Sequence, residues 1–130
     1  DMDRVEKARS ILRKSVEVNQ MMKVVGEEGT SSEDYTFYQK GELLDAVYLQ
    51  QNSFDEIDAA CSPERQRIEF NMMYDVINKT YDLQDKKEIR SFFNQLRQEF
   101  LDWHGTVFGT PEFEAQKQKV SDFYLAKAVN

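Results

Sequence analysis

The sequence predicts an all-α fold, a compact bundle of about five helices. Glycine and proline, which interrupt regular structure, occur only five and two times in 130 residues. Residues that favour helices dominate the rest, and apolar residues recur at three- and four-residue spacings between short polar segments. A chain of this length is expected to form one domain over 1–130 and to bury a core without disulfides or a structural metal.

The first helix is expected from about Met2 to Val25. Gly26 follows the last apolar residue, at a position where a helix end favours a residue that tolerates positive φ. The loop 26–31 comes next. The apolar residues on or near one face of this helix are Val5, Ala8, Ile11, Leu12, Val16, Val18, Met22 and Val25.

The second helix is expected to begin after a serine cap at Ser31 or Ser32. Glu33 and Asp34 would lie in its first turn, where the helix dipole favours negative charge. Gly41 lies within the helix at a cost of about 1 kcal/mol, and it would allow a neighbouring helix to pack closely. The buried side is expected to carry Phe37, Leu44, Val47 and Tyr48.

Three further helices are predicted from their starting signals. A capping side chain followed by proline starts two of them, at Ser62-Pro63 and Thr110-Pro111. Asp85 and Glu88 have the spacing of a capping box and start the helix between those two. The apolar stripes, in chain order, are Ile68, Met72, Met73, Val76, Ile77 and Tyr81; Ile89, Phe92, Phe93, Leu96, Phe100 and Trp103; and Phe113, Val120, Phe123 and Tyr124.

Charge and composition exclude several classes of function. With 17 basic and 24 acidic residues the net charge is −7, which argues against binding to nucleic acid and permits a basic protein partner. No charged segment leads into an apolar run, and no apolar run approaches the ~18 residues that span a bilayer. The chain begins at Asp1 rather than methionine, so we expect an excised domain of a longer subunit.

No catalytic or metal-binding group is predicted. The chain has no Gly-x-x-x-x-Gly-Lys-Ser/Thr loop, so it lacks the usual means of holding phosphates and should be inactive alone. The single histidine, His104, is interpreted as a capping or surface residue near a helix end. Cys61 is interpreted as a small apolar residue in a turn. The densest group of carboxylates, at 27–34, is on its pattern alone a solvated loop and helix start.

One segment is far more specific than the helix pattern. Residues 48–61 read Tyr-Leu-Gln-Gln-Asn-Ser-Phe, three residues, Asp, two residues and Cys. This resembles the Phe-Leu-Gln-Gln-Asn-Ala-Phe segment of the C-terminal helical domain of the catalytic A (alpha) subunit of vacuolar/archaeal-type (V-type) rotary ATPases and ATP synthases. The helix ending in Val24-Val25-Gly26 and the Ser31 to Asp34 continuation are also similar. The likeness covers about 11–81, and the tail 82–130 is only generically similar.

The resemblance implies a part in a motor that couples ATP synthesis or hydrolysis to rotation and to proton or sodium transport. Phe54 would pack on the adenine, with Ser53 and Gln51 beside it. On spacing alone, Phe54 would instead be a core residue between helices. ATP or ADP with magnesium would bind the full subunit, and no cofactor is expected in this chain by itself.

The loop 26–34 is also similar to the acidic loop that the beta subunit of F-type rotary ATPases holds toward the central shaft. The resemblance implies that Glu27, Glu28, Glu33 and Asp34 face the shaft. Here Gly29 stands where an acid is usual. The implied partners are the non-catalytic B subunit and the shaft, and the implied location is cytoplasmic, beside a membrane sector. The alternative is a non-catalytic helical protein-interaction module, which would have no reason to hold the Gln-Gln-Asn-Ser-Phe motif.

Overall fold

The computed structural model describes residues 2–49 and 63–129. Over these ranges it contains five α-helices and a short π-helical segment, and the all-α prediction is confirmed. The helices are α1 (Met2–Val25), α2 (Ser32–Leu44), α4 (Pro63–Ile77), α5 (Lys86–His104) and α6 (Pro111–Leu125), and the π-helical segment is η1 (Asp45–Leu49). The described strand-like pairing is limited to one isolated bridge between Tyr81 and Ala128.

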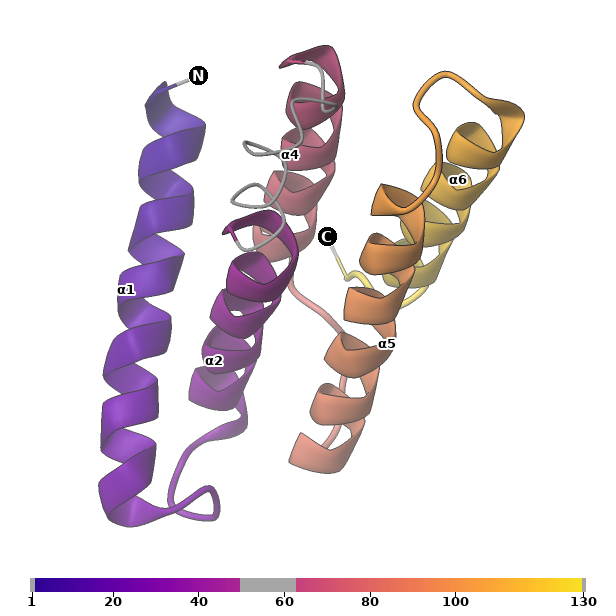
Figure 1. The fold of residues 1–130 in the computed structure, drawn as a ribbon. Helices are drawn as coiled ribbons and strands as arrows, with labels where there is room; N and C mark the ends of the chain where they lie inside the picture. The colour runs from indigo at the N-terminus through magenta and orange to yellow at the C-terminus, as the bar shows by residue number, and fades with distance from the viewer. Residues whose placement is uncertain (1, 50–62, 130) are drawn as a thin grey trace.

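The bundle consists of two helical hairpins and the helix α4 (Figure 1). The first consists of α1 and α2, and the second of α5 and α6. The hairpins are joined because α2 also packs against α5, while α4 contacts α1. Successive helices run in opposite directions, so the turn between α1 and α2 projects at one end of the molecule, away from the turn between α5 and α6 (Figure 1).

Three of the predicted capping residues start their helices, and the fourth, Ser62, lies outside the described residues. Ser31 accepts a hydrogen bond from the Asp34 amide (3.0 Å), and Asp85 accepts one from the Glu88 amide (2.8 Å). Thr110 accepts one from the Phe113 amide at 3.2 Å, with proline in the first turn. The reciprocal bond of the capping box is displaced by one residue, because Glu88 accepts from the Gln84 amide instead of the Asp85 amide. Gly26 has φ of 82°, as its place at a helix end requires.

The core is centred on α5, whose predicted stripe is confirmed. All six of its apolar residues are at most 6% exposed, and Trp103 is fully buried. Phe92 stacks on Phe123 of α6, with ring centroids 5.2 Å apart and planes inclined by 15°. Tyr81 lies 4.9 Å from Phe92, so the chain after α4 is held against the same aromatic cluster.

The predicted buried face of α1 is partly wrong. Val5, Val16 and Val25 were expected inside, but they are 37%, 54% and 50% exposed. The buried face instead consists of Ala8, Ile11, Ser15 and Val18. The difference arises because α2 crosses α1 along a narrow stripe that includes a serine, which a purely apolar pattern passes over. On α2, likewise, Tyr35 is buried while Phe37 is only half-buried.

The crossing point of α1 and α2 explains the glycine within α2. A Cβ atom at Gly41 would lie 2.1 Å from Ser15 Oγ and 2.2 Å from Ser15 Cβ, closer than atoms can approach. Ser15 Oγ donates a hydrogen bond to the Tyr38 carbonyl at 3.2 Å. The close packing predicted from Gly41 is therefore confirmed, and it holds the two helices of the first hairpin together.

Candidate functional site

The four predicted acidic residues lie together at the projecting end of the first hairpin. Glu27 and Glu28 are in the turn, and Glu33 and Asp34 are in the first turn of α2. We call the end of this hairpin, residues 21–34, the tip (Figure 1). Three of the four side chains are exposed, and Asp34 is half-buried.

Two of these carboxylates are held by basic side chains of the same chain. Glu27 forms an ion pair with Arg90 of α5. Asp34 lies 3.7 Å from the Lys14 ammonium of α1. In the part of the chain that the structure describes, Glu28 and Glu33 form no ion pair. The uncompensated negative charge of the four is therefore on these two residues.

The tip is also tied to α5 through its backbone. Lys86 Nζ donates to the Glu27 carbonyl at 2.6 Å. Arg90, which pairs with Glu27, donates from Nε to the hydroxyl of Tyr35 at 3.1 Å, and Gln39 donates to the same hydroxyl at 2.9 Å. This network links the turn, α2 and α5, and the tyrosine hydroxyl that accepts both bonds belongs to a side chain that is only 2% exposed.

Apolar side chains are exposed beside the acidic turn. On the last turns of α1, Met21 is 62% exposed, Val24 is 85% exposed and Val25 is 50% exposed. Their spacing of three and four places them on one face of the helix. Single exposed apolar residues are ordinary, and a group of three on one helix face is a candidate contact surface.

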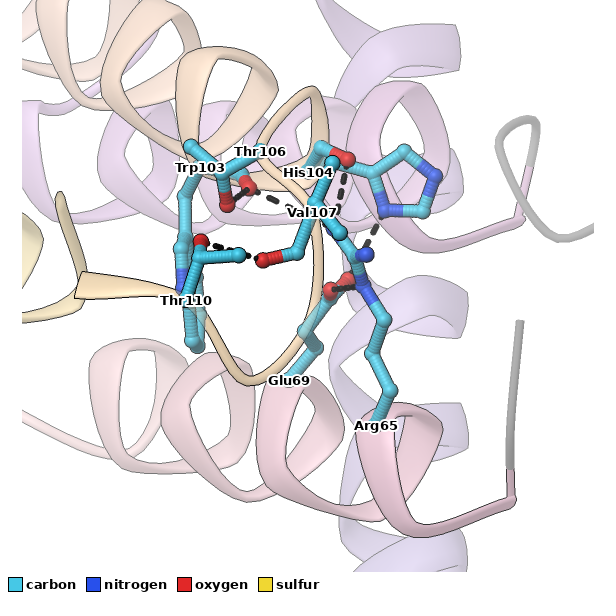
Figure 2. Close-up of polar contacts among 7 residues, drawn as sticks. All are labelled: Arg65, Glu69, Trp103, His104, Thr106, Val107 and Thr110. Carbon is cyan, nitrogen blue, oxygen red and sulfur yellow. Dashed lines mark hydrogen bonds and ion pairs between the residues drawn. The ribbon is translucent and has the colours of Figure 1, made fainter. Parts of the chain in front are cut away.

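A second polar cluster joins the start of α4 to the end of α5 (Figure 2). Arg65 Nε lies 2.7 Å from Glu69 Oε2, and Nη2 donates to the His104 carbonyl at 2.5 Å and the Trp103 carbonyl at 3.4 Å. His104 Nδ1 lies 2.9 Å from Glu69 Oε1. The guanidinium also lies over the Phe113 ring, 5.3 Å from its centre. Arg65 thus satisfies carbonyls that the end of α5 leaves without helical partners.

Glu69 is ionised in this setting. Burial by itself would raise the pKa of its carboxyl, but hydrogen bonds with His104 and Arg65 outweigh that effect and hold the pKa below its ordinary value. The interpretation of His104 as a surface or capping residue is therefore incomplete. Its side chain is 15% exposed and bonded to Glu69, a partner 35 residues away that no local pattern indicates.

The turn that follows this cluster is closed by two threonines (Figure 2). Thr106 Oγ1 donates to the Trp103 carbonyl, and Thr110 Oγ1 donates to the Val107 carbonyl, both at 2.6 Å. These bonds leave the Trp103 carbonyl with donors from both Arg65 and Thr106. Side-chain hydrogen bonds to the backbone therefore stabilise the turn between the two helices of the second hairpin.

The chain matches one family model over residues 2–93, described as the C-terminal domain of V and A type ATP synthase. The match covers more than half of the chain and includes the segment 48–61. The chain belongs to this family.

Alpha chains of V-type ATP synthases match this chain over the tail 82–130 as well. The chain is 48% identical over 129 residues to the V-type ATP synthase alpha chain of Borrelia garinii subsp. bavariensis, covering 99% of this chain and 22% of that protein. It is 44% identical over 127 residues to the V-type ATP synthase alpha chain of Treponema denticola, covering 98% of this chain and 22% of that protein. The chain thus spans about a fifth of these relatives. No solved structure matches it.

The resemblance to the A (alpha) subunit of V-type ATP synthases is confirmed, and it is wider than the sequence motif indicated. The tail 82–130 was expected to be only generically similar, yet the alpha chains match almost to the last residue. Residues 94–130 lie beyond the family model and contain most of α5 and all of α6. The sequence similarity to these alpha chains therefore includes the second hairpin.

The predicted nucleotide-contact residues of this V-type ATP synthase domain fall between η1 and α4. Gln51, Ser53 and Phe54 lie outside the described residues, so their roles stay predictions. The described chain resumes at Pro63, and the first turn of α4 carries Arg65.

Within 2–49 and 63–129, no group of three or more histidine, cysteine, aspartate or glutamate side chains could hold a metal ion. None of the helices described here has the length and apolar character needed to cross a membrane.

Lys40 is a buried basic group of this ATP synthase domain. It is 7% exposed, and Nζ donates to the Lys79 carbonyl at 2.7 Å. The rings of Phe37 and Tyr81 lie 5.6 and 5.8 Å from the ammonium. Burial lowers the pKa of Lys40 to about 8, and the charge of Lys7 adds to this effect.

We expect Lys40 to make the domain more stable as the pH rises above 8. The pKa of Lys40 is about 8 when folded and returns to its ordinary 10.5 when unfolded, so between these values the unfolded chain binds the extra proton. From pH 8 to 9.5 the free energy of unfolding should rise by about 1.5 kcal/mol. Urea titrations of the wild type and of Lys40→Met measure this. The rise should be absent in Lys40→Met, and equal pH profiles for the two proteins would contradict it.

Proposed function

We propose that this chain forms the C-terminal domain of a longer A subunit, residues 1–130 being one domain, and that it couples the nucleotide site to rotation. In the assembled enzyme it would link ATP synthesis or hydrolysis to turning of the central shaft and to transport of protons or sodium ions. Its partners would be the shaft and the non-catalytic B subunit, on the cytoplasmic side of a membrane sector. Family membership and the alpha-chain relatives support this, and they weigh against an unrelated interaction module.

The observation that carries the proposal is the tip. It is exposed and carries uncompensated acidic charge on Glu28 and Glu33. Behind it, the close crossing at Gly41 and the ties of Lys86 and Arg90 make the hairpin and α5 a rigid unit. An exposed end that is firmly joined to the rest of the domain can transmit a movement of the domain to a partner that contacts it.

A photoreactive side chain at position 28 tests this contact in the complete enzyme. Illumination should join the A subunit to the shaft and stop ATP-driven rotation. The same group at Glu114, an exposed residue of α6, should leave rotation unaffected. Attachment at position 28 to any subunit other than the shaft, or to none, would refute the proposed role of the tip.

We also propose that Phe54 packs on the adenine of ATP or ADP in the full subunit, with Ser53 and Gln51 beside it. The proposal rests on the motif and on family membership. Stacking on one face of a base is worth about 1–3 kcal/mol. The phosphates and magnesium must be held by another part of the subunit, because this chain has no phosphate-binding loop.

Phe54→Ala in the assembled enzyme should therefore weaken nucleotide binding by about 1–3 kcal/mol. Phe54→Tyr keeps the ring face and should bind normally, and the isolated chain should bind nucleotide weakly or not at all. Nucleotide titrations of the three assembled enzymes measure the effect. Normal binding by Phe54→Ala, together with a large loss of stability in the isolated domain, would instead make Phe54 a core residue.

A further inference from the structure

We infer that the tip engages the shaft through an apolar contact, made by Met21, Val24 and Val25, which the acidic residues border. The inference rests on the proposed function and specifies the chemistry of that contact. The partner surface would be a helical face of the shaft that presents apolar side chains with lysine or arginine beside them.

The acidic residues are poorly placed to supply the contact energy. Glu27 and Asp34 already pair with Arg90 and Lys14, so a basic partner would have to displace those side chains first. The remaining two, Glu28 and Glu33, are exposed to solvent. Ion pairs between exposed side chains contribute about 0–1 kcal/mol and weaken further with salt.

The apolar residues can supply more contact energy than these exposed ion pairs. Full burial of a valine or methionine side chain is worth about 1.5–3 kcal/mol, and Val24 and Met21 still expose most of that surface. The other large apolar side chains that the structure shows exposed are spread over several elements: Val5, Val16, Val107, Leu125 and Val129. Among the residues that the structure describes, only the tip has three of them within five residues on one helix face.

The turn after α1 packs closely against the end of this apolar face. A Cβ at Gly29 would lie 2.7 Å from the Val25 carbonyl and 3.0 Å from Val25 Cβ, so the turn is packed directly against the end of α1. Thr30, which is 7% exposed, donates from Oγ1 to the Gly26 carbonyl at 3.0 Å. The glycine that stands where an acid is usual is therefore explained by this close packing against Val25.

Charge defines the border of the contact. Glu17 lies four residues before Met21 on the same face of α1. Glu28 lies in the turn, three residues after the end of the helix at Val25. Both are exposed and form no ion pair among the described residues. Acidic groups at both ends of an apolar stripe favour a partner with basic groups flanking its own apolar side chains.

The test compares two double variants in the complete enzyme. Met21→Gln with Val24→Gln removes the apolar face, and Glu28→Gln with Glu33→Gln removes the free charge at nearly constant volume. Val16→Gln is the matched control, because Val16 is exposed on α1 but lies outside the tip. The readouts are ions transported per ATP hydrolysed, the KM for ATP, and the dependence of coupling on salt concentration.

The apolar variant should lower the coupling ratio about threefold or more, with KM for ATP and the control unchanged. The acidic variant should change coupling little, and coupling should persist at high salt. A coupling loss confined to the acidic variant, or loss of coupling at high salt, would overturn this inference while leaving the proposed function intact. If neither variant alters coupling, the inference is also wrong, and the cross-link at position 28 decides separately whether the tip contacts the shaft at all.

Discussion

Arg65→Met is expected to lower the free energy of unfolding of this domain by about 3 kcal/mol, the usual cost of removing one partner from a buried ion pair. Methionine keeps an unbranched side chain of similar length beside the Phe113 ring, over which the guanidinium lies. It cannot replace the bond to Glu69 or the bonds to the carbonyls of Trp103 and His104. The half-buried Glu69 would then keep its bond with His104 but lose its ion pair with arginine.

Thermal and urea unfolding of Arg65→Met and Arg67→Met test this. Arg67 is two residues along the same helix and exposed, so its replacement controls for the loss of one positive charge. Equal stability of the two variants would show that the cluster in Figure 2 contributes no more than a surface arginine.

The pH dependence provides an independent check on the same cluster. Because the pKa of Glu69 is lowered in the folded state, its ion pair stabilises the protein above the ordinary pKa and loses this effect as the pH falls. The stability gap between wild type and Arg65→Met should therefore narrow below about pH 4. A gap that stays constant down to acid unfolding would mean that Arg65 acts through packing alone.

Local signals predicted the helices well because each one depends on residues close in sequence. Ser31, Asp85 and Thr110 cap their helices through amides three residues on. All six apolar residues of the α5 stripe are buried, so the spacing of these residues alone identifies the face of the helix that points to the core. Both kinds of signal are complete within one element, and no tertiary information was needed.

The contacts that define the sites could not be predicted in this way. Arg65 and His104 meet across 39 residues, and only the four-residue spacing of Arg65 and Glu69 gave any local sign of an ion pair. The pairing of Glu27 with Arg90 spans 63 residues. For the same reason, the sequence indicated an acidic loop at the tip but could not show that half of its charge is neutralised.

The helix crossing in the first hairpin is the packing detail with the clearest consequence. Gly41→Ala is expected to lower the free energy of unfolding by about 2 kcal/mol. Overpacking costs up to about 3 kcal/mol, and alanine recovers about 1 kcal/mol over glycine within a helix. The cost is at the high end because the added carbon would meet Ser15 Cβ at 2.2 Å, and that atom can move only if α1 moves with it.

A double-mutant cycle with Ser15→Gly separates this clash from other effects of the mutation. Ser15→Gly removes both atoms that the new methyl group would strike, at a cost of about 1 kcal/mol for a glycine within α1. Gly41→Ala should then be nearly neutral in the Ser15→Gly background, a coupling energy of about 2 kcal/mol between touching residues. Gly105→Ala is the matched control, since its nearest neighbours would be carbonyl oxygens 3.5 Å away and its φ is −76°. If Gly41→Ala costs as much with Ser15→Gly as without it, the clash with Ser15 is not the cause of the loss, and the close crossing does not fix the geometry of the hairpin.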